Sequence, residues 1–170
     1  MTVSQDLPEL VRAAQDTAKA AQDRMAQILM TADGQELSEP QAEQMTSETI
    51  AIELAAVDIF AVFEARMQGH FKRGPLSRKV KAALMDAGQA DLADRLHQHY
   101  LAVNVLKHGT GASYRELLNN KSTLIVVRQA AEVTTNGEGL STGLVDVTAP
   151  RFFDGLTQAI LDAYAFLEKK

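Results

Sequence analysis

The sequence predicts one mainly α-helical domain, an antiparallel bundle of about five helices with a β-hairpin before the C-terminal helix. Apolar residues recur at spacings of three and four over most of the chain, as they do along one face of a helix. Residues with a high helix propensity, above all Ala, Leu, Gln and Glu, dominate the first two thirds. One segment, about 123–148, follows the alternating pattern of strands instead.

The composition narrows the class of protein. The chain has 170 residues, of which 46% are hydrophobic, and it contains no Cys and no Trp. A chain of this length without an internal repeat or a linker is interpreted as a single domain, residues 1–170. The lack of Cys excludes a disulfide framework, a zinc ribbon, an Fe–S cluster and a thiol nucleophile. We expect no cofactor and no bound metal.

Charge and hydropathy bear on the partners and the location. The net charge of −5 argues against sequence-independent coating of nucleic acid, but it permits a local basic patch. No apolar run reaches the roughly 18 residues that span a bilayer. The first six residues lack the basic and apolar regions of a signal peptide. We therefore expect a cytoplasmic protein that does not contact a membrane.

Two long helices open the predicted bundle. The first extends from near Pro8 to near Met30, and its apolar residues form one narrow stripe. The second is capped by Ser38 and continues to about Phe71. Between residues 50 and 63 this second helix is apolar nearly all round, which is typical of a helix buried by several neighbours or by a second subunit. We therefore expect a homodimer.

Three shorter helices follow in the predicted order. Ser77 caps a helix that ends near Met85, and a longer helix over 91–107 is stopped by Gly109. A further helical turn or two occupies 113–118.

Beyond residue 119 the pattern changes from helix to strand. Residues 124–127 are short, apolar and largely β-branched, and residues 143–148 alternate with period two. The Asn136-Gly137 pair between them is a strong signal for a hairpin turn. These observations predict a β-hairpin over about 123–148, followed by a last helix that begins at Pro150.

A polar stripe runs along the predicted 91–107 helix. His97, Leu101, Asn104 and His108 follow one another at helical spacing on one face. Two imidazoles and an amide beside apolar neighbours are unusual for a plain core helix. The alternative for His108 is an ordinary helix C-cap before Gly109.

The segment Asn104-Val105-Leu106-Lys107-His108-Gly109 ends a helix that follows a long apolar helix with Glu64 near its end. This arrangement resembles the HEPN superfamily over about residues 40–118. HEPN proteins are helical bundles, usually dimeric, and many are metal-independent ribonucleases of prokaryotic toxin–antitoxin and defence systems. Their nuclease motif is Arg, a spacer whose first residue is often Asn, and then His. Asn104 and His108 match this motif, whereas Leu101, Ala102 and Val103 occupy the positions allowed for its arginine.

The missing arginine affects the implied chemistry. Cleavage of RNA without a metal needs a base for the 2′-hydroxyl and a cation for the developing phosphorane charge. With His108 as the base and Asn104 beside it, Lys107 would have to provide the cation. The resemblance therefore implies the fold and a dimer more than it implies nuclease activity.

A basic patch surrounds the turn at Gly74-Pro75, in a chain that is acidic overall. It consists of His70, Lys72, Arg73, Arg78, Lys79 and Lys81. Together with His97, this patch is the candidate binding surface for RNA or for the phosphate of a nucleotide. The alternative is a solvated start of a helix.

Two hypotheses of function remain open at this point. The first is a HEPN-like module that binds RNA or nucleotides, or serves as a toxin–antitoxin or defence component. The second is a non-enzymatic, dimeric interaction protein whose polar stripe is structural. A metal-binding bundle is a third interpretation, and it requires Glu53, Glu64, Asp94 and His97 to converge.

Overall fold

The computed structural model describes residues 6–71, 74–120, 124–129 and 143–169. This part of the chain forms six helices, against a prediction of about five. They are α1 (Leu7–Ala32), α2 (Glu39–Met67), α3 (Leu76–Asp86), α4 (Ala90–His108), α5 (Ala112–Asn119) and α6 (Pro150–Glu168). A single 3-10 turn, η1 (Gln68–His70), follows α2 directly. None of the described helices is both long and apolar enough to cross a membrane.

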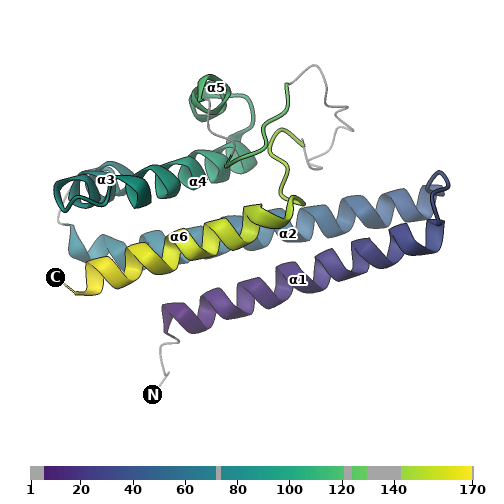
Figure 1. Ribbon diagram of the computed structural model, residues 1–170, viewed down its shortest axis with the longest axis horizontal. Helices are drawn as coiled ribbons and strands as arrows, with labels where there is room; N and C mark the ends of the chain where they lie inside the picture. The colour runs from purple at the N-terminus through teal and green to yellow at the C-terminus, as the bar shows by residue number, and fades with distance from the viewer. Residues whose placement is uncertain (1–5, 72–73, 121–123, 130–142, 170) are drawn as a thin grey trace.

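The four long helices form the bundle, and the two short ones pack on its edge (Figure 1). α2 and α6 lie in the middle, and each of them contacts both α1 and α4. α3 and α5 both pack against α4, the helix of the bundle that carries both short helices. The α1–α2 pair also extends past the end of α6, as Figure 1 shows. The candidate site lies on the outer side of α4, between α3 and α5.

The α1–α2 pair packs along a seam with coiled-coil spacing. On α1 the buried residues follow one another at spacings of three, four and seven, and they are Leu7, Val11, Ala18, Ala21, Met25 and Ile28. On α2 buried residues also recur at spacings of three and four, at Ile52, Ala56, Ile59 and Phe63. Because several of these residues are Ala, the two helices can pack closely over a narrow stripe. The predicted stripe of the first helix is confirmed.

The ends of two helices show the local chemistry that was predicted for them. Ser38 accepts a hydrogen bond from the Gln41 backbone N–H, and the Gln41 side chain accepts one from the Ser38 N–H, which is a complete capping box. Gly109 ends α4 with a φ of 73°, a conformation that favours glycine. The prediction that Ser77 caps α3 is wrong, because α3 begins at Leu76 and Pro75 occupies the cap position. Ser77 therefore lies in the first turn.

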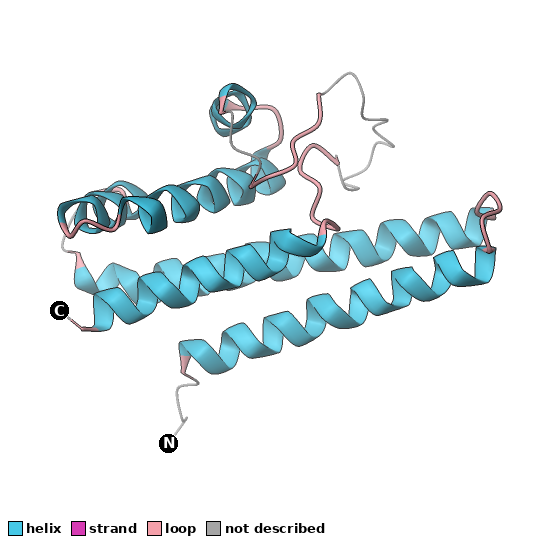
Figure 2. Cartoon of the chain, in the orientation of Figure 1, coloured by secondary structure: helices cyan, strands magenta, loops and turns pink. Residues whose placement is uncertain are grey.

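The predicted β-hairpin is wrong. In the described residues 124–129 and 143–149 there is no strand, only one isolated antiparallel bridge between Val127 and Val145 (Figure 2). Two backbone hydrogen bonds flank this bridge, from Arg128 N–H to Leu144 O and from Asp146 N–H to Val126 O. The predicted Asn136-Gly137 turn lies outside the described residues.

The reason is visible in the burial pattern. The neighbours Leu144 and Val145 are both buried in the core, as are Ile125 and Val147. Successive side chains of a strand point to opposite faces, so a regular strand here would expose one residue of each adjacent pair. The chain bends at Leu144 instead and uses both side chains to cover the end of the bundle. Burial of these side chains takes precedence over a regular strand.

Candidate functional site

The polar stripe of α4 faces α5 and holds it in place. His97 Nε2 donates a hydrogen bond to Glu116 Oε2 over 2.6 Å. One end of α5 is also held by Asn104, whose Nδ2 donates to Ser113 Oγ over 3.2 Å. α5 buries Tyr114 against the rest of the protein, so it is anchored by apolar packing as well. The stripe thus has a structural task, the attachment of α5.

A cleft of about 420 Å³ opens between α3, α4 and α5. Its lining combines cations, an imidazole, a phenol ring and hydroxyls. The residues that line it are Ser77, Arg78, Lys81, His97, Tyr100, Leu101, Ala112, Ser113 and Glu116. A volume in this range accommodates a small organic ligand of about the size of a nucleotide.

The basic side of the cleft comes from α3. Val80 and Leu84 bury one face of this helix, and Arg78 and Lys81 are consequently exposed one turn apart on another face. Neither cation makes an ion pair with another described residue. Among the described residues that line the cleft, Glu116 is the one acid. The cleft therefore has two positive charges free to meet a ligand and one negative charge already engaged by His97.

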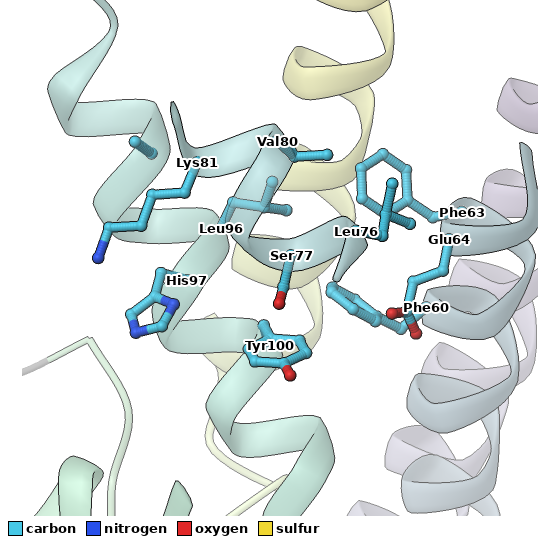
Figure 3. A pocket seen from close by; sticks show the side chains of 11 residues that line it. Phe60, Phe63, Glu64, Leu76, Ser77, Val80, Lys81, Leu96, His97 and Tyr100 are labelled. Atoms are coloured by element: carbon cyan, nitrogen blue, oxygen red, sulfur yellow. The ribbon is translucent and has the colours of Figure 1, made fainter. Parts of the chain in front are cut away.

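An aromatic floor continues from the cleft towards α2. The rings of His97 and Tyr100 stack with centroids 6.0 Å apart and planes 27° from parallel. Phe60 on α2 extends the row, with its ring centroid 6.2 Å from that of Tyr100. Figure 3 shows Lys81 next to His97 at one end of this row of rings and Glu64 next to Phe60 at the other end. Flat rings beside free cations can accept a stacked base or a planar group next to an anion.

A much smaller cavity lies at the inner end of this floor, between α2, α3 and α4 (Figure 3). Its volume is about 20 Å³, room for roughly one water molecule. Glu64 lines this cavity, and burial raises the pKa of its carboxyl group, while the positive charge of Lys107 opposes the shift. The small cavity is too tight for a ligand, so the outer cleft is the candidate site.

The structure brings together three of the predicted binding residues and separates the others. Arg78, Lys81 and His97 line the same cleft. Lys79 is exposed on α3 but does not line it. Lys72 and Arg73 lie outside the described residues. His70 is in η1, where its Nε2 is 3.2 Å from Glu168 Oε1 of α6.

The three predicted catalytic residues do not line the cleft. Asn104 contacts α5 through Ser113, as described above. Lys107 and His108 are exposed in the last turn of α4, just before Gly109. The position of His108 therefore fits the helix-end alternative, and neither His108 nor Asn104 lines the cleft between α3, α4 and α5.

Sequence reasoning missed Glu116, Tyr100 and Ser113. Glu116 and Ser113 lie on α5, whose role could not be recognised until its contacts with α4 were known. One signal was available, since a stripe with His97 and Asn104 needs polar partners when it packs against a helix. Polar residues that could supply such partners occur a short way downstream, at 113–116.

The metal-binding interpretation finds no centre in the structure. Nowhere in the described ranges do three or more His, Asp or Glu side chains gather in a way that could hold a metal ion. Two members of the proposed set have other partners: Asp94 accepts a hydrogen bond from Gln98, and His97 is bonded to Glu116. Glu53, Glu64, Asp94 and His97 therefore do not form the expected ligand set.

The arrangement can bind an anion by charge and hydrogen bonds, and it can present a flat ring surface beside that anion. Arg78 and Lys81 have no ion-pair partner among the described residues, His97 is an oriented imidazole, and Ser77 and Ser113 offer hydroxyl donors. The chain matches no family model, no curated protein and no solved structure in comparisons with each, so the geometry of this cleft carries the functional argument.

Proposed function

We propose that this protein binds a phosphate-bearing ligand, RNA or a nucleotide, in the cleft between α3, α4 and α5. The observation that carries the proposal is the pair Arg78 and Lys81, two cations without an ion-pair partner among the described residues, facing one cleft. Phosphate oxygens are strong acceptors for both groups, and Arg can bind them in a bidentate way.

The size and floor of the cleft support a single nucleotide or a short single-stranded segment. With a volume of about 420 Å³, the cleft is too small to hold an RNA duplex. The stacked rings of His97 and Tyr100 provide a surface for a base, which adds affinity without strict sequence preference. The HEPN resemblance of residues 40–118 points to the same class of ligand. In this proposal the protein is a binding module, since the cleft lacks His108.

The test is binding of a fluorescently labelled single-stranded RNA, measured by anisotropy, to the wild type and to two lysine variants. Lys81→Ala removes a cation from the cleft, and Lys79→Ala removes one from the same helix outside it. We expect Lys81→Ala to weaken binding about tenfold and to reduce the slope of log K against log salt by about 0.7. Lys79→Ala should change the affinity by less than about twofold. Equal effects of both variants would show that the RNA contacts the basic surface in general, and they would refute the proposal that it binds in the cleft.

A second candidate function has its own observation, a second apolar stripe on α2. Ile50, Leu54, Val57 and Ala61 follow one another at spacings of four, three and four, on the side of α2 opposite the buried Ile52, Ala56 and Ile59. Leu54 is 57% exposed, and Ile50 and Val57 are half-buried. This helix is thus not buried all round by its own chain. We propose that the stripe pairs with the α2 stripe of a second copy, which makes the protein a homodimer with an isologous interface.

Sedimentation velocity tests the homodimer. Leu54→Lys places a charge in the middle of the stripe and should convert the dimer to a monomer. Met30→Lys is the matched control, because Met30 is also strongly exposed but lies on α1. A wild-type protein that sediments as a monomer at high micromolar concentration would remove this candidate.

A further inference from the structure

We infer that Glu116 is an internal competitor of the ligand: its carboxylate occupies the His97 imidazole and is displaced when a phosphate group enters the cleft. This inference rests on the proposed function, since it assigns a form of regulation to the same cleft.

The geometry places the carboxylate where an anionic ligand would bind. Glu116 Oε2 lies 2.6 Å from His97 Nε2, a short distance that is typical of a charge-assisted hydrogen bond. A phosphate oxygen accepts the same kind of bond from the same N–H. The imidazole can therefore serve Glu116 or the phosphate, and the two anions compete for it.

The exposure of the two partners shows which side chain can move. The Glu116 side chain is 56% exposed, whereas that of His97 is 22% exposed. His97 is also held by its stacking contact with Tyr100. Glu116 thus reaches over a fixed imidazole from the solvent side, and it can rotate into water without disturbing the aromatic floor.

The rest of α5 stays in place during this exchange. Tyr114 and Leu117 are buried, and the Tyr114 hydroxyl donates a hydrogen bond to Arg128 O over 2.8 Å. The displacement therefore involves the side chain of Glu116 and not the whole helix.

The negative charge of Glu116 also reduces the attraction that Arg78 and Lys81 exert on an anion. All three residues line the same cleft. At the surface of a protein, one unit charge at several ångströms changes the interaction with an ionic ligand by about 1 kcal/mol, close to a fivefold change in affinity. Neutralising Glu116 should thus strengthen binding through both effects, a free imidazole and a more positive cleft.

The experiment measures the affinity of full-length protein for the labelled single-stranded RNA used above, with inorganic phosphate as a second probe. Glu116→Gln keeps the shape of the side chain and removes its charge, and we expect it to tighten RNA binding about fivefold. Glu168→Gln removes the carboxylate from the surface pair with His70 and changes the net charge equally, so it should leave the affinity within about twofold. Tyr114→Phe loosens the anchor of α5 without a change in the cleft, and it should not tighten binding.

A double variant tests whether the His97 imidazole is the group for which Glu116 and the ligand compete. In a His97→Ala protein, Glu116→Gln should tighten binding less than it does in the wild type, because no imidazole remains to be released. A Glu116→Gln protein that binds RNA as weakly as the wild type, or more weakly, overturns the inference. The proposed function is tested separately by Lys81→Ala: if this variant binds RNA as tightly as the wild type, the cleft is not the binding site. If Lys81→Ala weakens binding but Glu116→Gln does not tighten it, only the inference about Glu116 fails.

Discussion

His99 makes the stability of this protein depend on pH in a direction that can be worked out from the structure. The side chain is 1% exposed, on the side of α4 that packs against α6. Its Nδ1 donates to the Arg95 backbone oxygen over 2.8 Å, while Nε2 has no hydrogen-bond partner in the described part of the protein. Gly155 of α6 lies against this nitrogen, and the ring also packs on Phe152. The imidazole is consequently held in its neutral form.

Burial is the main cause that lowers the pKa of His99, and the positive charge of Arg95 adds to the effect, whereas the hydrogen bond to the Arg95 backbone opposes it. In the unfolded chain the pKa of a histidine is about 6.5. Below that pH the unfolded state binds a proton that the folded state does not. The free energy of unfolding therefore decreases as the pH falls from about 6.5 towards the folded-state pKa, and the contribution is constant below it.

The size of this effect follows from the linkage relation. A single proton changes the free energy of unfolding by at most about 1.4 kcal/mol for each pH unit. Each unit by which the folded-state pKa lies below about 6.5 corresponds to the same amount of stability lost in acid.

The assay is urea unfolding of the wild type and of His99→Leu at pH 7.5 and pH 5.0. Leu fills a similar volume and does not titrate, so the variant should lose less stability between the two pH values than the wild type does. His108→Gln is the control, because His108 is exposed on the same helix, and it should keep the wild-type dependence. An equal loss of stability in the wild type and in His99→Leu would refute the reasoning, since it would assign the acid sensitivity to other groups.

Three further predictions concern single sites. Gly155→Ala would place a Cβ 3.1 Å from His99 Nε2, a contact too close for a buried ring that has no room to move. Thermal unfolding should therefore show that the free energy of unfolding falls by about 1 kcal/mol, although Ala has a better helix propensity than Gly. Glu64→Gln should raise the free energy of unfolding at pH 7.5 and have a smaller effect in acid, because burial raises the pKa of this carboxyl and so destabilises its charged form in the folded protein; a loss of stability at pH 7.5 would show that its attraction to Lys107 dominates. His108→Ala should leave RNA affinity within about twofold of the wild type in the anisotropy assay, because the side chain lies outside the cleft; a large loss would return His108 to the site.

The helices were predictable because their signals are local. The apolar stripe of α1, the Ser38 cap of α2 and the Gly109 end of α4 each depend on residues within one or two turns of one another. The hairpin was not predictable in the same way. The alternating pattern over 143–148 is compatible with a strand. A stable strand, however, needs a partner strand and a core that buries only one of its two faces. Here the adjacent residues Leu144 and Val145 are both buried in the core.

Part of the candidate site was also visible in the sequence. Arg78, Lys81 and His97 were singled out because basic residues and an imidazole are unusual in their surroundings. Their grouping was not visible, since fifteen residues lie between Lys81 and His97 in the chain and the packing of α3 on α4 decides whether they meet.

The sequence alone thus determined the helical class of this protein, the position of most of its helices and the chemical character of three residues of the cleft, because these properties arise from composition and short-range periodicity. Only the tertiary structure decided that α5 lies on the polar stripe of α4, that Glu116 engages His97, and that Lys107 and His108 lie outside the cleft. Such pairings depend on how helices that are separate in the chain pack together, and packing is set by the shape and burial of the whole core.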